Sequence, residues 1–121
     1  MAGRVSLTDA QVRDWLLNFY VPERLANPSM RDLLRAHGRL AEGSPAAVAR
    51  QAQALMQEPI EALRPADDAP SAAWRPYRVT LVYLQRRTSD LAGSALGLSL
   101  RQMSRERTRA IRLLRAELEN P

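Results

Sequence analysis

The stretch SDLAGSALGLSLRQMSRERTRAIRLL, residues 89–114, decides the fold. It contains two helical segments separated by Gly97, a residue type that adopts the positive φ of a tight turn at little cost. After the glycine, Ser99 and Gln102 have the spacing of a capping box, in which each side chain accepts a hydrogen bond from the other residue's backbone N–H. The sequence therefore predicts a short helix that ends near Leu96, a turn, and a final long helix that begins at Ser99.

The spacing of small and apolar residues in this stretch is that of a helix-turn-helix. Ala92 and Gly93 allow the two helices to cross closely, and the apolar Met103 follows the turn glycine by six positions. We expect the core shared by these helices to contain Leu96, Leu98, Met103, Ala110 and Leu114.

The second helix of the stretch carries side chains that can read DNA. Its outward side chains are expected to be Leu100, Arg101, Gln102, Ser104 and Arg105. In the major groove arginine binds guanine and glutamine binds adenine through paired hydrogen bonds, so base reading is assigned to Arg101, Gln102, Ser104 and Arg105. Gln102 cannot fully serve both as part of a cap and as a base contact. Phosphate contacts, which position the protein on DNA, are expected from Arg75, Arg86, Arg87, Ser99 and Arg109.

The run from Leu96 to Ile111 resembles the DNA-binding helix-turn-helix of bacterial transcription regulators. It is most similar to sigma factor region 4-like and LuxR-like modules, in which a Leu-Gly-Leu-Ser turn precedes an arginine-rich helix. The resemblance covers residues 74–118 and implies a tri-helical DNA-binding core with residues 100–118 as the recognition helix. Two positions depart from the pattern: Gly93 stands where alanine is common, and Arg107 stands where an apolar core residue is often found.

Charge is distributed unevenly along the chain. All 18 basic residues are arginine, which suggests the coding bias of a GC-rich bacterial gene. Residues 1–73 have a net charge of −1, whereas residues 74–116 hold ten arginines and two acidic residues, a net charge of +8. Such a basic segment is typical of a protein that binds a polyanion. The alternative is a solvated arginine-rich helix surface that has no partner.

The N-terminal part shows the starts of several helices. Thr8 and Gln11 form another predicted capping box, followed by an apolar helical face. Cap residues followed by proline open two further helices, at Asn27-Pro28 and Ser44-Pro45. The first of these is expected to run to Gly43 with Leu40 on its apolar face, and the second to end where Pro59 begins a separate turn.

The composition predicts an all-α protein, because 37 residues are alanine or leucine and only 12 are valine, isoleucine or threonine. We expect an N-terminal helical bundle over residues 1–64, which forms a core or mediates dimerisation. Residues 65–73, with two prolines, are expected to form a connecting loop, and residues 74–121 the DNA-binding region.

Several classes of site are excluded by residue content. The chain has no cysteine and one histidine, which excludes a disulfide framework or a thiolate zinc site and makes a multi-histidine metal site improbable. His37 is expected to be a packed or partly exposed residue and not a ligand. No catalytic constellation is visible, so the sequence predicts no enzyme, no cofactor and no metal. The absence of an apolar stretch near the length of a membrane span predicts a cytoplasmic protein.

Together these observations predict a sequence-specific DNA-binding bacterial transcription regulator that reads the major groove of double-stranded DNA with helix 100–118. A homodimer is expected, because a lone recognition helix reads only a few base pairs. The alternative is a protein-interaction module that docks on RNA polymerase, a sigma factor or another regulator through the same helix-turn-helix-like corner.

Overall fold

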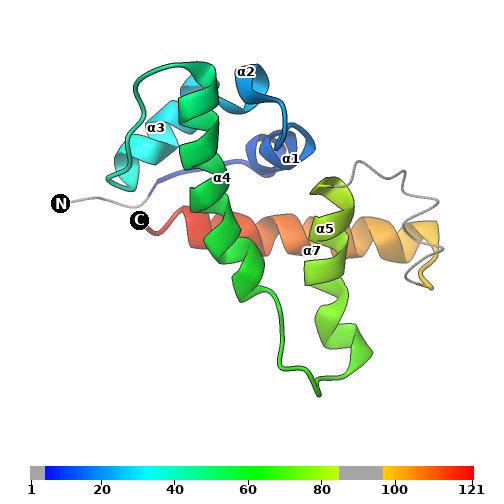
Figure 1. Cartoon of the computed structure of the whole chain (residues 1–121). Coiled ribbons are helices and arrows are strands. Elements are labelled where there is room, and N and C mark those ends of the chain that lie inside the picture. The colour runs from blue at the N-terminus through cyan, green and yellow to red at the C-terminus, as the bar shows by residue number, and fades with distance from the viewer. Residues whose placement is uncertain (1–4, 85–96) are drawn as a thin grey trace.

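The chain is an all-α protein, as the computed structural model in Figure 1 shows. The structure describes residues 5–84 and 97–121, and every regular element in these two ranges is helical. In chain order the elements are α1 (Asp9–Leu17), α2 (Pro22–Leu25), α3 (Pro28–Ala36), α4 (Pro45–Ala62), the 3-10 helix η1 (Ser71–Trp74), α5 (Arg75–Leu84) and α7 (Leu100–Leu118). The first helix of the predicted helix-turn-helix lies outside the described residues, so that part of the motif stays a prediction.

The predicted helix starts are confirmed. The hydroxyl of Thr8 accepts a hydrogen bond from the backbone N–H of Gln11 at 3.1 Å, and the side-chain oxygen of Gln11 accepts one from the backbone N–H of Thr8 at 2.9 Å. Asn27 and Ser44 cap α3 and α4 through their side chains, and each is followed by proline at the first helical position. These starts are predictable because all the atoms involved lie within four residues.

The expected extension of α3 to Gly43 is wrong. The helix ends at Ala36, because Gly38 adopts a φ of +67°. The backbone N–H groups of Gly38 and Arg39 bond carbonyls of the last helical turn at 3.0 and 2.8 Å, the pattern of a Schellman motif. Leu40 therefore lies beyond the helix and is 68% exposed, not part of the apolar face.

The expectation that Pro59 begins a separate turn is also wrong. Pro59 lies inside α4, which continues to Ala62. Proline removes one helical hydrogen bond, but here it lies in the last turn of a helix that packs both Pro59 and Ile60 into the interior. We infer that burial of these side chains holds the last turn in helical form.

Helix α7 joins two hydrophobic cores. The larger core contains side chains of α1 to α4 together with Ile111, Leu114 and Leu118 from the second half of α7. The smaller core contains Val79, Val82, Leu98, Met103 and Ala110, where α5 packs against the first half of α7. Trp74 is only half-buried and lies against the guanidinium groups of Arg64 and Arg78.

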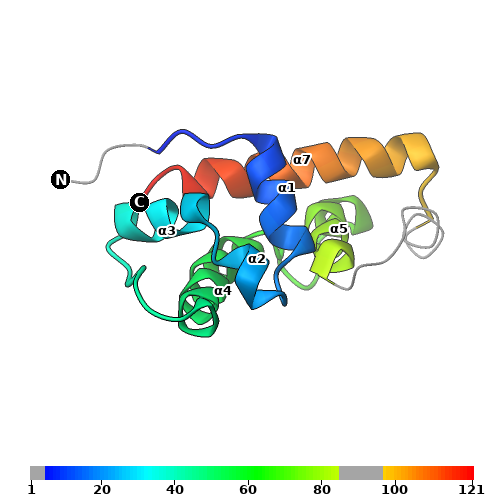
Figure 2. The same ribbon diagram turned by 90° about the horizontal axis from the view of Figure 1, so that it is seen from above.

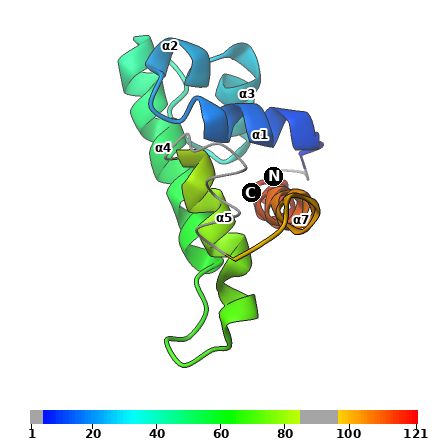
Figure 3. The ribbon, with the colours of Figure 1, turned by 90° about the vertical axis from the view of Figure 1, so that its right-hand side faces the viewer.

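The views in Figures 1 to 3 show how α7 relates to the other helices. It crosses α5 and contacts α1 and α4 as well. Figure 3 looks along α7, with α1 above it and α5 beside it. Figure 2 shows that the leading end of α7 extends beyond both α1 and α5, so this end projects past the other helices that the structure describes.

Candidate nucleic-acid interface

The first turn of α7 is held by the predicted capping box. The hydroxyl of Ser99 accepts a hydrogen bond from the backbone N–H of Gln102 at 3.2 Å, and the side-chain oxygen of Gln102 accepts one from the backbone N–H of Ser99 at 2.9 Å. The Ser99 hydroxyl keeps its own hydrogen for donation to a phosphate. The Gln102 oxygen is already engaged, and a paired contact with adenine would need the same atom. The structure thus favours the capping role of Gln102.

The other predicted base-reading side chains lie on the surface of the projecting end. Arg101, Ser104 and Arg105 are all exposed. Neither Arg101 nor Arg105 forms an ion pair with a residue in 5–84 or 97–121, so no acidic side chain of that part of the chain neutralises them. The structure brings these three side chains together on the first two turns of α7.

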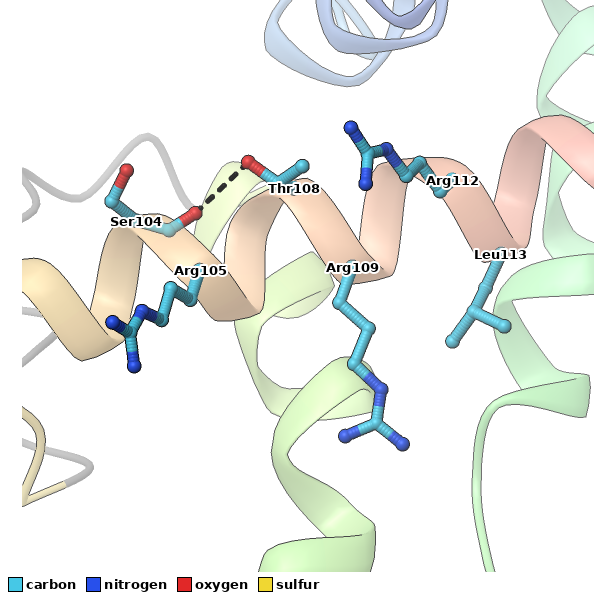
Figure 4. Close-up of a pocket in the computed structure, with 6 residues that line it drawn as sticks. All are labelled: Ser104, Arg105, Thr108, Arg109, Arg112 and Leu113. Atoms are coloured by element: carbon cyan, nitrogen blue, oxygen red, sulfur yellow. Dashed lines mark hydrogen bonds between the residues drawn. The ribbon is translucent and has the colours of Figure 1, made fainter.

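Further along the helix, Arg109 extends this charged surface. Its side chain is 62% exposed and its Nη1 atom lies 4.0 Å from Oε2 of Glu106, a loose contact between neighbours on the helix. Figure 4 shows Arg105 and Arg109 projecting to the same side of α7. A shallow depression of about 470 Å³ along this stretch of α7 is lined by Ser104, Arg105, Thr108, Arg109, Arg112 and Leu113.

Three of these lining residues, Thr108, Arg112 and Leu113, are missing from the sequence-based assignment. Arg112 follows Arg101 by eleven positions, about three turns, and so falls on the same side of an ideal helix. That spacing could have identified Arg112. Thr108 donates its hydroxyl hydrogen to the carbonyl oxygen of Ser104 at 3.1 Å. The methyl group of Thr108 lies on the side away from Ser104. A threonine inside a helix commonly bonds the carbonyl four residues earlier, so this pairing is local as well.

Of the remaining residues predicted to contact phosphate, the structure describes one. Arg75 begins α5 and is half-buried, next to the 3-10 helix η1. Arg86 and Arg87 lie outside the described residues, and their assignment to phosphate stays a prediction. The structure therefore groups Ser99 and Arg109 on one helix with the base-reading candidates and places Arg75 on a different helix.

Two arginines in the second half of α7 contact one carboxylate of α1. Nη1 of Arg115 lies 2.8 Å from Oδ1 of Asp9, and Nε of Arg112 lies 3.7 Å from Oδ2 of the same carboxylate. In Figure 4 the Arg112 side chain is turned away from the side that carries Arg105 and Arg109. Arg112 is thus shared between the exposed charged surface and a contact with α1.

The C-terminal end of α7 is held by hydrogen bonds from distant segments. The backbone N–H of Leu7 donates to Oε2 of Glu119 at 2.9 Å, and the backbone N–H of Val5 donates to the Glu119 carbonyl at 3.0 Å. Nε2 of His37 lies 2.7 Å from the carbonyl oxygen of Leu118. His37 is partly exposed, one of the two expected alternatives. These contacts tie the C-terminal end of α7 to the segment before α1 and to the end of α3.

Within residues 5–84 and 97–121, no group of three or more histidine, aspartate or glutamate side chains is arranged to hold a metal ion. None of the helices described there has the length and apolar character needed to cross a membrane. No protein-family model, curated protein or solved structure matches this chain. Its function is therefore argued from the arrangement of its own residues.

Proposed function

We propose that this protein is a sequence-specific DNA-binding transcription regulator that inserts the leading end of α7 into the major groove of double-stranded DNA. It acts through binding and carries out no catalysis. The observation that carries the proposal is the pair Arg101 and Arg105, exposed on a projecting helix end and unpaired by any acidic side chain in the described ranges.

Three physical features support this use of α7. The helix is rigidly mounted, because its second half is packed in the larger core. Its N-terminus carries the positive end of the helix dipole, next to a Ser99 hydroxyl that can donate to a phosphate. An α-helix with its side chains fits the width of the major groove, where arginine can recognise guanine by two hydrogen bonds.

The proposed division of roles follows from position. Arg101, Arg105 and Ser104 meet the base edges, whereas Ser99 and Arg109 contact phosphates beside them. Arg75, Arg86 and Arg87 are proposed to contact the DNA backbone outside the groove. Because one helix end reads only a few base pairs, we propose that two copies of the chain bind two half-sites.

Fluorescence anisotropy with random-sequence duplex DNA tests binding itself. Because neutralised phosphates release counterions, affinity is expected to fall by orders of magnitude between roughly 50 and 200 mM salt. Arg86→Ala and Arg87→Ala should each weaken binding to all duplexes alike. Each should also reduce the slope of log affinity against log salt concentration by about one. Binding that is undetectable at low salt would contradict the proposal.

Selection of bound fragments from a random duplex pool then tests sequence reading. At a selected site, Arg101→Ala and Arg105→Ala should each cost about 1–3 kcal/mol and relax the base preference. Arg50→Ala is the matched control, because Arg50 is also an exposed arginine on a long helix but lies on α4. If both α7 variants bind every duplex as the parent does, α7 is not the reading helix.

A second candidate function is favoured by a groove between α1 and α7. A cavity of about 400 Å³ there is lined by Arg13, Leu17, Ser104, Arg107, Thr108 and Ile111. Arginines beside apolar side chains suit an acidic, amphipathic segment of a protein such as RNA polymerase, a sigma factor or another regulator. Lack of DNA binding at low salt would favour this protein-interaction role.

A further inference from the structure

Leu100 is an exposed apolar residue at the start of a strongly charged helix. It is the first residue of α7 and is 61% exposed, although the same helix buries five other side chains. Leu40, the other leucine of similar exposure in the described ranges, lies in a loop. Leu100 instead follows the cap residue Ser99 and precedes Arg101, where the proposed function places DNA.

The helix geometry places Leu100 on the same surface as the base-reading side chains. Successive residues are rotated by about 100° around a helix, so positions 100, 101, 104, 105 and 108 cover one continuous surface. The capping box between Ser99 and Gln102 fixes the backbone of this turn, and with it the position of Leu100. A side chain on such a rigid turn can distinguish small differences in a binding partner.

Most of the chemistry on this surface is polar, and Leu100 is its one large apolar side chain. Arg101 and Arg105 offer hydrogen-bond donors, and the Thr108 hydroxyl is already bonded to the Ser104 carbonyl. In the major groove, base edges present hydrogen-bonding groups and one apolar group, the C5-methyl of thymine. An apolar side chain inserted there desolvates polar base edges at a cost unless it meets that methyl group.

We infer that Leu100 is a specificity-determining residue that contacts the C5-methyl group of a thymine next to the bases read by arginine. This inference rests on the proposed function and adds to it the identity of one base. Burial of one methyl group corresponds to about a fourfold change in affinity. The preference for thymine over uracil at that position should have this size.

The test compares thymine with uracil in otherwise identical duplexes. Duplexes are first selected from a random pool by the full chain. Each thymidine of a selected duplex is then replaced, one at a time, by deoxyuridine, which lacks the C5-methyl group and keeps the base pairing. For the unchanged protein we expect one position in each half-site to lose affinity about three- to fivefold. Leu100→Ala should bind the thymine duplex more weakly by a similar factor and should no longer distinguish uracil from thymine there.

Two controls separate this role from a general effect. Leu40→Ala removes an equally exposed leucine from a distant loop and should leave the thymine preference unchanged. Leu100→Met keeps an apolar side chain and should restore most of the discrimination that Leu100→Ala loses. Thermal unfolding of each variant verifies that the fold is intact, as expected for an exposed side chain.

The outcomes distinguish the inference from the proposed function. If no duplex is enriched in the selection, both are overturned. If a sequence is selected but contains no position sensitive to uracil, or if Leu100→Ala retains the preference, the role of Leu100 is overturned and DNA reading by α7 stands.

Discussion

Replacing Leu114 by alanine tests whether α7 and the N-terminal helices form one cooperative unit. Leu114 is 1% exposed and belongs to the larger core, together with Trp15 of α1 and Leu55 of α4. The substitution removes three buried carbon atoms, which corresponds to roughly 2.4 kcal/mol of transfer free energy. It also leaves a cavity, which adds to the cost. We expect the free energy of unfolding to fall by about 3–4 kcal/mol.

The assay is urea unfolding followed by two signals. Far-ultraviolet circular dichroism reports on all helices, and tryptophan fluorescence in a Trp74→Phe background reports on Trp15 alone, since the chain has two tryptophans. Both transitions should shift together to lower urea, because Leu114 and Trp15 share a core. Leu113→Ala is the control: Leu113 is the adjacent residue, is 40% exposed, and should change stability by no more than about 0.5 kcal/mol.

One result would refute this reasoning. If Leu114→Ala moves the circular dichroism transition and leaves the Trp15 transition in place, α7 unfolds separately from α1. The projecting end of α7 would then lack the rigid mount on which base reading depends.

Three further predictions concern single contacts. Gly38→Ala should lower the free energy of unfolding in urea by about 1 kcal/mol, because Gly38 has a φ of +67° and a Cβ is disfavoured there. An unchanged urea midpoint would contradict the Schellman motif that ends α3. Asp9→Asn should cost about 0.5–1 kcal/mol, and less at high salt, because it weakens the carboxylate contact with Arg115; a loss independent of salt would argue against an electrostatic origin. Burial, and then the nearby carboxylate of Glu61, raise the pKa of Tyr77, so near-ultraviolet titration should show a tyrosine ionising above the ordinary value of about 10 that is absent in Tyr77→Phe. Because the fold favours the neutral phenol of Tyr77, its raised pKa contributes to the free energy of unfolding. This contribution is fully present below the ordinary pKa of tyrosine and is lost as the pH rises through the raised pKa of the folded protein.

Much of the candidate interface could be predicted from residue spacing. The capping box of Ser99 and Gln102 is local, and the bounds of α7 agree with the expected helix over residues 100–118. The conflict between the capping and reading roles of Gln102 was also predictable, because both need the same side-chain oxygen. The partners of Arg112 and Arg115 were not, because Asp9 lies about a hundred residues away in the chain.

By itself, the sequence determined the all-α class, the starts of the capped helices and the concentration of arginine on the last helix, because caps and helical periodicity depend on residues within a few positions of one another. Only the tertiary structure decided where α3 ends, that α4 continues through Pro59, and which helices cover each half of α7. Periodicity shows that one face of a helix is apolar but not which helix covers it. The second half of α7 packs against α1 to α4 and Met103 in its first half packs against α5, while Arg101 and Arg105 stay exposed.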